Sequence, residues 1–260
     1  MSEISVQRQG PVAIVTVDRP PHNHVTVDLM RGLADALDGI DAARDLRASV
    51  LQTAGKSFCA GADLVAGIVM PSPASGGGLG GGVDSLYVEA VRLFSAKKPI
   101  VAAVQGAAVG AGLGLALVAD FRVAAPEARF AANFVKLGFH PGFGITHTLP
   151  RLIGGQRAAL MCLTGRRIKG EEALDWGLVD QIVPLDQLRG AALALAREIA
   201  ENAPLAVQST RATLRRDLAE AVRAQTAHEL KEQTWLRQTA DYAEGVRAVQ
   251  ERRPGNFVGA

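Results

Sequence analysis

The sequence predicts an α/β protein with a core of strands and helices followed by a C-terminal helical region. Strand-like and helix-like patterns alternate over residues 1–184, and such alternation is typical of α/β folds. Residues 185–260 carry only helical patterns. We therefore expect one site-bearing core and one helical appendage. The helices expected in the appendage span about 186–202, 204–216, 218–236 and 239–250.

The composition is that of an ordinary soluble globular protein. The chain has 260 residues, of which 48% are hydrophobic and 21% charged. Its net charge of +2, with the 28 Lys and Arg residues dispersed, argues against nucleic acid as a partner. No apolar run reaches the roughly 18 residues of a membrane span, residues 1–5 lack a signal-peptide pattern, and two cysteines make no disulfide framework. We expect a cytoplasmic protein without a membrane partner.

Local patterns place the elements of the core. Gln9-Gly10-Pro11 is a hairpin turn between two short strands, and Thr26 is placed to cap a helix. Apolar runs and helical spacing predict the remaining elements. The expected strands are 5–8, 12–17, 48–53, 100–104, 121–124 and 179–183, and the expected helices are 27–40, 85–96, 149–153, 155–164 and 170–176.

The most informative stretch runs from Lys97 to Asp120. After the apolar strand and a turn, Gly110, Gly112 and Gly114 remove side chains where a helix is expected to begin. A bare helix N-terminus offers unpaired backbone N–H groups and a positive dipole end, which suit a developing oxyanion. A small-residue helix packed tightly in a core is an equally good interpretation of this stretch alone.

Three further segments are predicted to be loops. Residues 54–64 consist of small residues before a short helix. Residues 71–83 hold six glycines, but no Gly-Lys-Ser/Thr follows, so we expect a mobile low-complexity loop rather than a phosphate site. Residues 130–145 form a loop that is rich in Gly and Phe.

Four blocks of this sequence, in their order and spacing, resemble the enoyl-CoA hydratase/isomerase (crotonase) superfamily. The resemblance runs from about Ile4 to Gly259. It implies a spiral of repeated ββα turns, a C-terminal trimerisation region, and a homotrimer or dimer of trimers. It also implies an acyl-CoA thioester as substrate, with coenzyme A as part of that substrate and no other cofactor. The blocks are 57–64, 99–120, 163–179 and 244–257.

The resemblance also assigns an oxyanion hole. The thioester carbonyl oxygen would lie between the backbone N–H groups of Ala62 and Ala111, and such donors are worth about 10²–10³ in rate each. Small residues at Ala60 and Gly110 would let the backbone approach the thioester closely.

The chain departs from the hydratase pattern at the acid/base positions. By count, the two glutamates of the hydratases fall on Gly114 and Phe134, and the aspartate of some isomerases and a dehalogenase falls on Gly142. None of these residues can exchange a proton. We expect Gly114 and Phe134 to line the substrate pocket, and we do not expect hydration by the paired-glutamate route.

Other residues are candidates for the vacant roles. His140 is the leading acid/base candidate because imidazole titrates near neutral pH, with a structural loop histidine as the alternative. Asn133 could orient a ligand or cap a turn. Cys59 is expected to be a small buried thiol, and the sequence shows no metal-ligand spacing.

The remaining candidates are assigned to substrate binding by the resemblance. His22 lies in a loop that relatives use near the CoA adenine. Asp63 and Leu64 follow the oxyanion loop, where Asp63 could instead cap the next helix. Arg252 and Phe257 match tail residues that approach the CoA nucleotide in relatives, sometimes across a subunit boundary; the alternative is a solvated basic terminus.

Two functions follow from these observations. The first is an acyl-CoA enzyme that stabilises a thioester enolate and uses a non-standard acid/base set. The second is a non-catalytic acyl-CoA-binding protein or partner subunit that kept the pocket and lost the chemistry.

Overall fold

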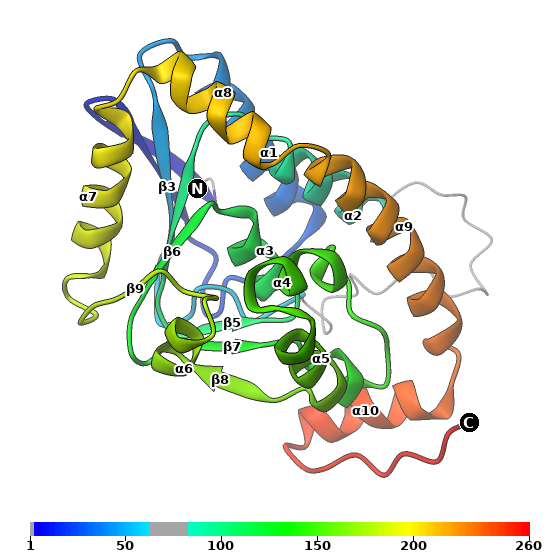
Figure 1. Cartoon of the computed structure of the whole chain (residues 1–260). Coiled ribbons are helices and arrows are strands. Elements are labelled where there is room, and N and C mark those ends of the chain that lie inside the picture. The colour runs from blue at the N-terminus through cyan, green and yellow to red at the C-terminus, as the bar shows by residue number, and fades with distance from the viewer. Residues whose placement is uncertain (1–2, 63–82) are drawn as a thin grey trace.

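The computed structural model describes residues 3–62 and 83–260, and Figure 1 shows a mixed α/β structure with helices on both faces of its larger sheet. That sheet has six strands in the order β1-β2-β3-β4-β6-β9. Strand β1 pairs antiparallel with β2, and the other neighbours are parallel. The strands are β1 (Ile4–Gln9), β2 (Val12–Val17), β3 (Ala48–Thr53), β4 (Ile100–Val104), β6 (Phe121–Ala124) and β9 (Gln181–Ile182).

A second sheet has three short strands in the order β5-β7-β8. Strand β5 is parallel to β7, and β7 is antiparallel to β8. From β4 to β7, successive strands alternate between the two sheets, because β4 and β6 belong to the larger sheet and β5 and β7 belong to the second. The strands are β5 (Ala107–Val109), β7 (Arg129–Ala131) and β8 (Arg167–Lys169).

The helices cover both faces of the larger sheet and extend beyond it. Helix α7 packs on one face, while α1, α2 and α3 lie on the other, and α8 to α10 run along the remaining side (Figure 1). The bounds are α1 (Val27–Ala42), α2 (Val83–Phe94), α3 (Ala111–Val118), α4 (Ile145–Ile153), α5 (Gly155–Thr164), α6 (Gly170–Asp175), α7 (Leu188–Ala200), α8 (Pro204–Leu214), α9 (Leu218–Leu236) and α10 (Ala240–Gln250), with a 3₁₀ helix η1 (Asn133–Leu137).

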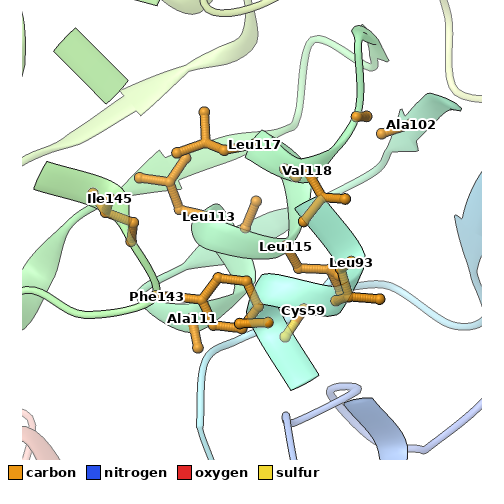
Figure 2. Close-up of a cluster of buried hydrophobic side chains, with 14 of the residues drawn as sticks. Cys59, Leu93, Ala102, Ala111, Leu113, Leu115, Leu117, Val118, Phe143 and Ile145 are labelled. Atoms are coloured by element: carbon orange, nitrogen blue, oxygen red, sulfur yellow. The ribbon is translucent and has the colours of Figure 1, made fainter. Parts of the chain in front are cut away.

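Helix α3 lies in the main hydrophobic core. All eight of its residues are buried, as expected for a helix that is apolar on every side. Figure 2 shows Leu113, Leu115 and Leu117 of α3 together with Phe143, just before α4, and Ile145, the first residue of α4. The packed-helix interpretation of this stretch is therefore correct, and it does not exclude a role for the N-terminus of the helix.

Two arginine side chains hold the C-terminal end of α3 by hydrogen bonds to its carbonyl groups. The buried Arg122 guanidinium donates to the Ala119 carbonyl at 2.7 Å, and Arg215 donates to the Val118 carbonyl at 3.1 Å. The Asp120 carboxylate accepts from both Arg211 and Arg215. Cations at this end satisfy free carbonyls and complement the helix dipole.

Several predicted elements are confirmed. Strands β1 and β2 form the expected hairpin, and Thr26 caps α1 by accepting the Leu29 N–H at 3.0 Å. The predictions for α9 and α10 agree with the structure to within one residue.

The predictions around the second sheet were wrong. Strands β5, β7 and β8 were not expected, and residues 130–145 are not a simple loop, since they hold the end of β7, the helix η1 and the start of α4. Three-residue strands are too short to show a period of two. The expected short helix after residue 62 and most of the 71–83 loop lie outside the described residues.

Candidate active site

Two backbone segments meet closely at one end of α3. The Cys59 N–H donates to the Ala107 carbonyl at 2.8 Å, and the Val109 N–H donates to the Cys59 carbonyl at 3.0 Å. A Cβ atom at Gly112 would lie 2.0 Å from the Cys59 carbonyl oxygen, so only glycine allows this approach. The small residues therefore bring the segment 58–62 and the start of α3 into direct contact.

This arrangement places two free backbone donors beside the same cavity. Ala111 is the first residue of α3, and its N-cap Gly110 has φ 56° and provides no side-chain cap. Within residues 3–62 and 83–260, neither the Ala111 N–H nor the Ala62 N–H donates a hydrogen bond to an acceptor. Both residues line the cavity. The dipole of α3 adds a positive potential at Ala111.

The cavity has a volume of about 260 Å³ and is mostly apolar. Its first side is the pair of backbone segments just described, and its second side consists mainly of aromatic rings from α2, η1 and the loop after η1. Its third side comes from α9 and α10. These sides comprise, in that order, Ala60, Gly61, Ala62, Val109, Gly110 and Ala111; Leu86, Tyr87, Phe134, Leu137, Phe139, Gly142 and Phe143; and Gln233, Arg237, Val246, Val249 and Gln250, with His24 and Asn133 also at the wall.

By count, acidic residues of relatives fall on Gly114 and Gly142 of this chain. The structure leaves little space for a side chain at either position. A Cβ at Gly114 would lie 2.5 Å from the ring of Phe143. A Cβ at Gly142 would lie 2.1 Å from the Tyr87 hydroxyl. Phe134, at the third position, is buried and packs edge-on against Phe139 with ring centroids 5.5 Å apart. Aromatic groups occupy all three places.

Tyr87 supplies a hydroxyl group to this wall. It donates a hydrogen bond to Gln233 Oε1 at 2.9 Å, and Gln233 Nε2 donates to the His140 carbonyl at 2.9 Å. Burial raises the pKa of Tyr87 well above its ordinary value. The phenol therefore keeps its proton at neutral pH and is fixed in orientation.

His140 does not line the cavity. Its Nδ1 lies 2.8 Å from the Pro141 carbonyl oxygen, and its ring packs edge-on against that of His228 with centroids 5.9 Å apart. Its catalytic role stays a prediction that requires a different side-chain orientation.

The remaining predicted binding residues are spread over the structure. His22 is exposed, and its carbonyl accepts the Ala60 N–H at 3.1 Å, whereas its neighbour His24 lines the cavity. Arg252 and Phe257 are exposed on the tail that follows α10 and do not line the cavity within one protomer. Asp63 and Leu64 lie outside the described residues.

Sequence reasoning did not single out Tyr87, Gln233 or Arg237. They lie on α2 and at the end of α9, far from the recognisable blocks in sequence, and only the tertiary fold brings them to the cavity. The guanidinium of Arg237 lies 5.5 Å from the centroid of the Phe139 ring. The local sequence around a polar residue in the helical tail does not indicate that its side chain reaches a cavity.

One prediction about a reactive group can be compared with the structure. Cys59 is fully buried, which confirms the expected small buried thiol, and burial raises the pKa of its thiol to about 12. The described part of the chain holds no cluster of three or more His, Cys, Asp or Glu side chains that could bind a metal ion.

A comparison with known proteins agrees with this fold. The model of the enoyl-CoA hydratase/isomerase family matches residues 7–260. A carnitinyl-CoA dehydratase of Salmonella arizonae is 34% identical over 265 residues, with all of both chains covered. The carnitinyl-CoA dehydratase of Salmonella agona is also 34% identical, over 97% of each chain.

Solved structures give the same result. An enoyl-CoA hydratase/isomerase from Pseudoalteromonas atlantica superposes with a TM-score of 0.88 at 30% identity, covering 99% of this chain and 100% of the other. An enoyl-CoA hydratase from Mycobacterium avium subsp. paratuberculosis superposes with a TM-score of 0.83 at 28% identity, covering 99% of each chain.

The fold and the cavity thus define a crotonase-type α/β protein. This chain belongs to the enoyl-CoA hydratase/isomerase family. Across residues 3–62 and 83–260, no helix has both the length and the apolar character needed to cross a membrane.

Proposed function

We propose that this protein is an enzyme that acts on an acyl-CoA thioester and stabilises its enolate between the backbone N–H groups of Ala62 and Ala111. The acid/base groups differ from the paired glutamates of hydratases, and the reaction is a lyase or isomerase reaction. The substrate brings coenzyme A, and no other cofactor is required. The observation that carries this proposal is a pair of N–H groups on one small apolar cavity, neither of which has an acceptor in the part of the chain that the structure describes.

The physical argument concerns where charge develops. Forming an enolate from a thioester moves negative charge onto the carbonyl oxygen, and preorganised donors there lower the barrier. Because the cavity is mostly apolar, such donors act more strongly than they would in water. Helix α3 is fixed by its packing and by the arginines at its C-terminus, so Ala111 keeps its position during the reaction.

The test replaces one donor without disturbing the helix. Proline is accepted at the first position of a helix, so Ala111→Pro removes the N–H with a small effect on folding, about 1 kcal/mol or less. We expect kcat/KM on the best substrate of a CoA-thioester panel to fall by about 10²–10³. The matched variant Ala111→Gly keeps the N–H and should lose far less; equal losses in both variants would contradict the oxyanion role.

Two side chains are candidates for the proton transfer. Tyr87 lines the cavity with a hydroxyl group that Gln233 holds in a fixed orientation, so it is placed beside a bound substrate, but its raised pKa makes it a weak acid. His140, the candidate from sequence, would have to turn away from His228. Turnover by Tyr87→Phe and His140→Ala, compared on the same substrate, separates the two roles.

The alternative is an acyl-CoA-binding protein or partner subunit without catalysis. The aromatic groups at the three expected acid/base positions favour it, because they make the pocket apolar. Calorimetric binding of CoA thioesters without conversion of any of them would support this function. Failure to bind coenzyme A or its esters would contradict both functions.

The name of the Salmonella relatives suggests a specific substrate. Dehydration of a carnitinyl thioester would place a quaternary ammonium group in the cavity. Arg237 brings a guanidinium to the cavity wall, and like charges repel. We propose that this chain takes a different acyl group.

We also propose a homotrimer or a dimer of trimers, and a cytoplasmic location. Large apolar side chains that are exposed on one protomer support the assembly, since such patches commonly mark interfaces. Leu205 and Leu214 on α8 are 80% and 74% exposed, and Leu163 on α5 is 76% exposed. Light scattering during size-exclusion chromatography tests the assembly.

A further inference from the structure

Arg237 is a cation at the wall of the cavity. It follows the last residue of α9, and its side chain lines the same cavity as Ala62 and Ala111. Its Nε and Nη1 atoms are buried, and neither has a hydrogen-bond partner within residues 3–62 and 83–260. The side chain therefore brings donors to the cavity that the described part of the protein does not use.

The surroundings of Arg237 are aromatic. The guanidinium lies over the Phe139 ring, and burial lowers its pKa while the phenols of Tyr242 and Tyr87 act in the opposite direction. The Tyr87 hydroxyl already donates to Gln233, and within residues 3–62 and 83–260 no carboxylate forms a salt bridge with Arg237. The aromatic faces attract the cation but do not neutralise its charge.

Two buried arginines elsewhere in the molecule have acceptors for most of their donor nitrogen atoms, although Nη2 of Arg211 has none within the described residues. Arg122 donates to the carbonyls of Leu178 and Ala119 at 2.6 and 2.7 Å, and Arg211 forms two hydrogen bonds with the Asp120 carboxylate at 2.9 and 3.0 Å. Burying a charge without a partner is unfavourable. The unmet donors of Arg237 lie at the cavity, where a ligand can supply the acceptor.

Two aromatic rings lie between the start of α3 and the Arg237 guanidinium. Phe134 lies beside Gly110, because its ring would be 3.7 Å from a Cβ there. The Phe134 and Phe139 rings are in contact, and Phe139 contacts Arg237. An apolar wall of two rings thus connects the start of α3 with the guanidinium.

We propose that Arg237 binds a carboxylate at the far end of the acyl group, so that the substrate is the CoA thioester of a short dicarboxylic acid. This inference rests on the proposed function, because it takes the thioester carbonyl to lie at Ala62 and Ala111. A guanidinium binds a carboxylate through two parallel hydrogen bonds. The methylene groups between the two ends would pack along Phe134 and Phe139.

Binding of saturated thioesters tests this inference without knowledge of the reaction. Calorimetry would compare CoA thioesters of monocarboxylic and dicarboxylic acids with four, five or six carbon atoms, together with the methyl esters of the latter. At one chain length the wild-type protein should bind the carboxylate form on the order of 10- to 100-fold more tightly than its methyl ester, since hydrogen bonds to charged groups are the stronger ones.

Variants then assign the preference to one residue. Arg237→Met should abolish the preference for the carboxylate over its methyl ester, and the neutral thioesters should lose much less affinity than the carboxylate forms. Arg237→Lys should keep part of it, because a lysine retains the charge but lacks the planar fork. Arg247→Met is the matched control on α10, where Arg247 is 61% exposed and pairs with Glu244, and it should keep the full preference.

Each contrary result has a distinct meaning. Equal binding of the carboxylate and methyl-ester forms by the wild-type protein would overturn the inference and leave the proposed function intact. Equal losses for charged and neutral thioesters in Arg237→Met would show that the arginine contacts coenzyme A itself, which also overturns it. Binding of no thioester at any length would overturn the proposed function together with the inference.

Discussion

Helices α3 and α4 begin in the same way but satisfy their free N–H groups differently. Each follows a glycine with positive φ, 56° at Gly110 and 71° at Gly144, and neither N-cap supplies a side-chain hydrogen bond. At α4, the Glu229 carboxylate accepts the Gly144 N–H at 2.7 Å and the Thr146 N–H at 3.2 Å. At α3, the Ala111 N–H faces the cavity instead.

The difference shows what each helix start is used for. A buried helix start needs acceptors, and at α4 the protein provides them with its own fully buried Glu229. Burial raises the pKa of that carboxyl to about 7, although the hydrogen bonds from Thr146 and Gly144 oppose the shift. At α3 a substrate would bring the acceptor, and its charge would develop only during the reaction.

Removing the acceptor at α4 should have the largest effect. Glu229→Leu leaves the N–H groups of Gly144 and Thr146 and the Thr146 hydroxyl without their partner. We expect the unfolding free energy at pH 5 to fall by about 4 kcal/mol, measured by urea unfolding. Glu220→Leu, at a 73% exposed position on the same helix, should change it by about 0.5 kcal/mol or less; similar losses in the two variants would refute the capping role.

The protonation of Glu229 should have a slightly smaller effect. The pKa of Glu229 in the folded state, about 7, lies above the ordinary value of 4.5. Between pH 4.5 and pH 7 the folded state therefore keeps a proton on Glu229 that the unfolded state has lost. The stabilising contribution is therefore full below pH 4.5 and is lost as the pH rises to 7. Across this window we expect wild-type stability to fall by about 3 kcal/mol relative to Glu229→Leu, and parallel pH profiles would contradict the assignment.

Removal of one hydroxyl at α4 should have the smallest effect. The Thr146 hydroxyl donates to Glu229 Oε1 at 2.6 Å and accepts from Gln225 at 2.8 Å. Thr146→Val should lower the unfolding free energy by about 1 kcal/mol. Because this hydrogen bond lowers the pKa of Glu229, the fall of stability with pH should also move to higher pH, and an unshifted profile would show that the hydroxyl does not act on the carboxyl.

The sequence predicted most of the fold because long elements carry strong periodic signals. The hairpin of β1 and β2, the Thr26 cap of α1 and the tail helices follow from local patterns. Strands β5, β7 and β8 depend on pairing between distant segments, such as Ala107 with Arg129, and pairing of this kind leaves no local pattern in three residues.

Only the backbone segments of the candidate site could be predicted from the sequence. Glycines and alanines at 60–62 and 110–112 are visible in the sequence because close backbone approach requires small residues. The side-chain half could not be predicted, because Tyr87, Gln233 and Arg237 reach the cavity from helices that the family motifs do not include. Asn133, left open between two roles by the sequence, lies at the cavity wall.

The contact between Gly114 and Phe143 has a consequence for how this sequence can change. Phe143 has φ 63° and is buried, with its ring against the Cα of Gly114. A carboxylate introduced at position 114 alone would collide with that ring, and a smaller residue at 143 alone would leave a cavity in the core. A glutamate at position 114 therefore requires a smaller residue at position 143 at the same time. Two linked substitutions, rather than one, separate this sequence from one that carries a glutamate at position 114.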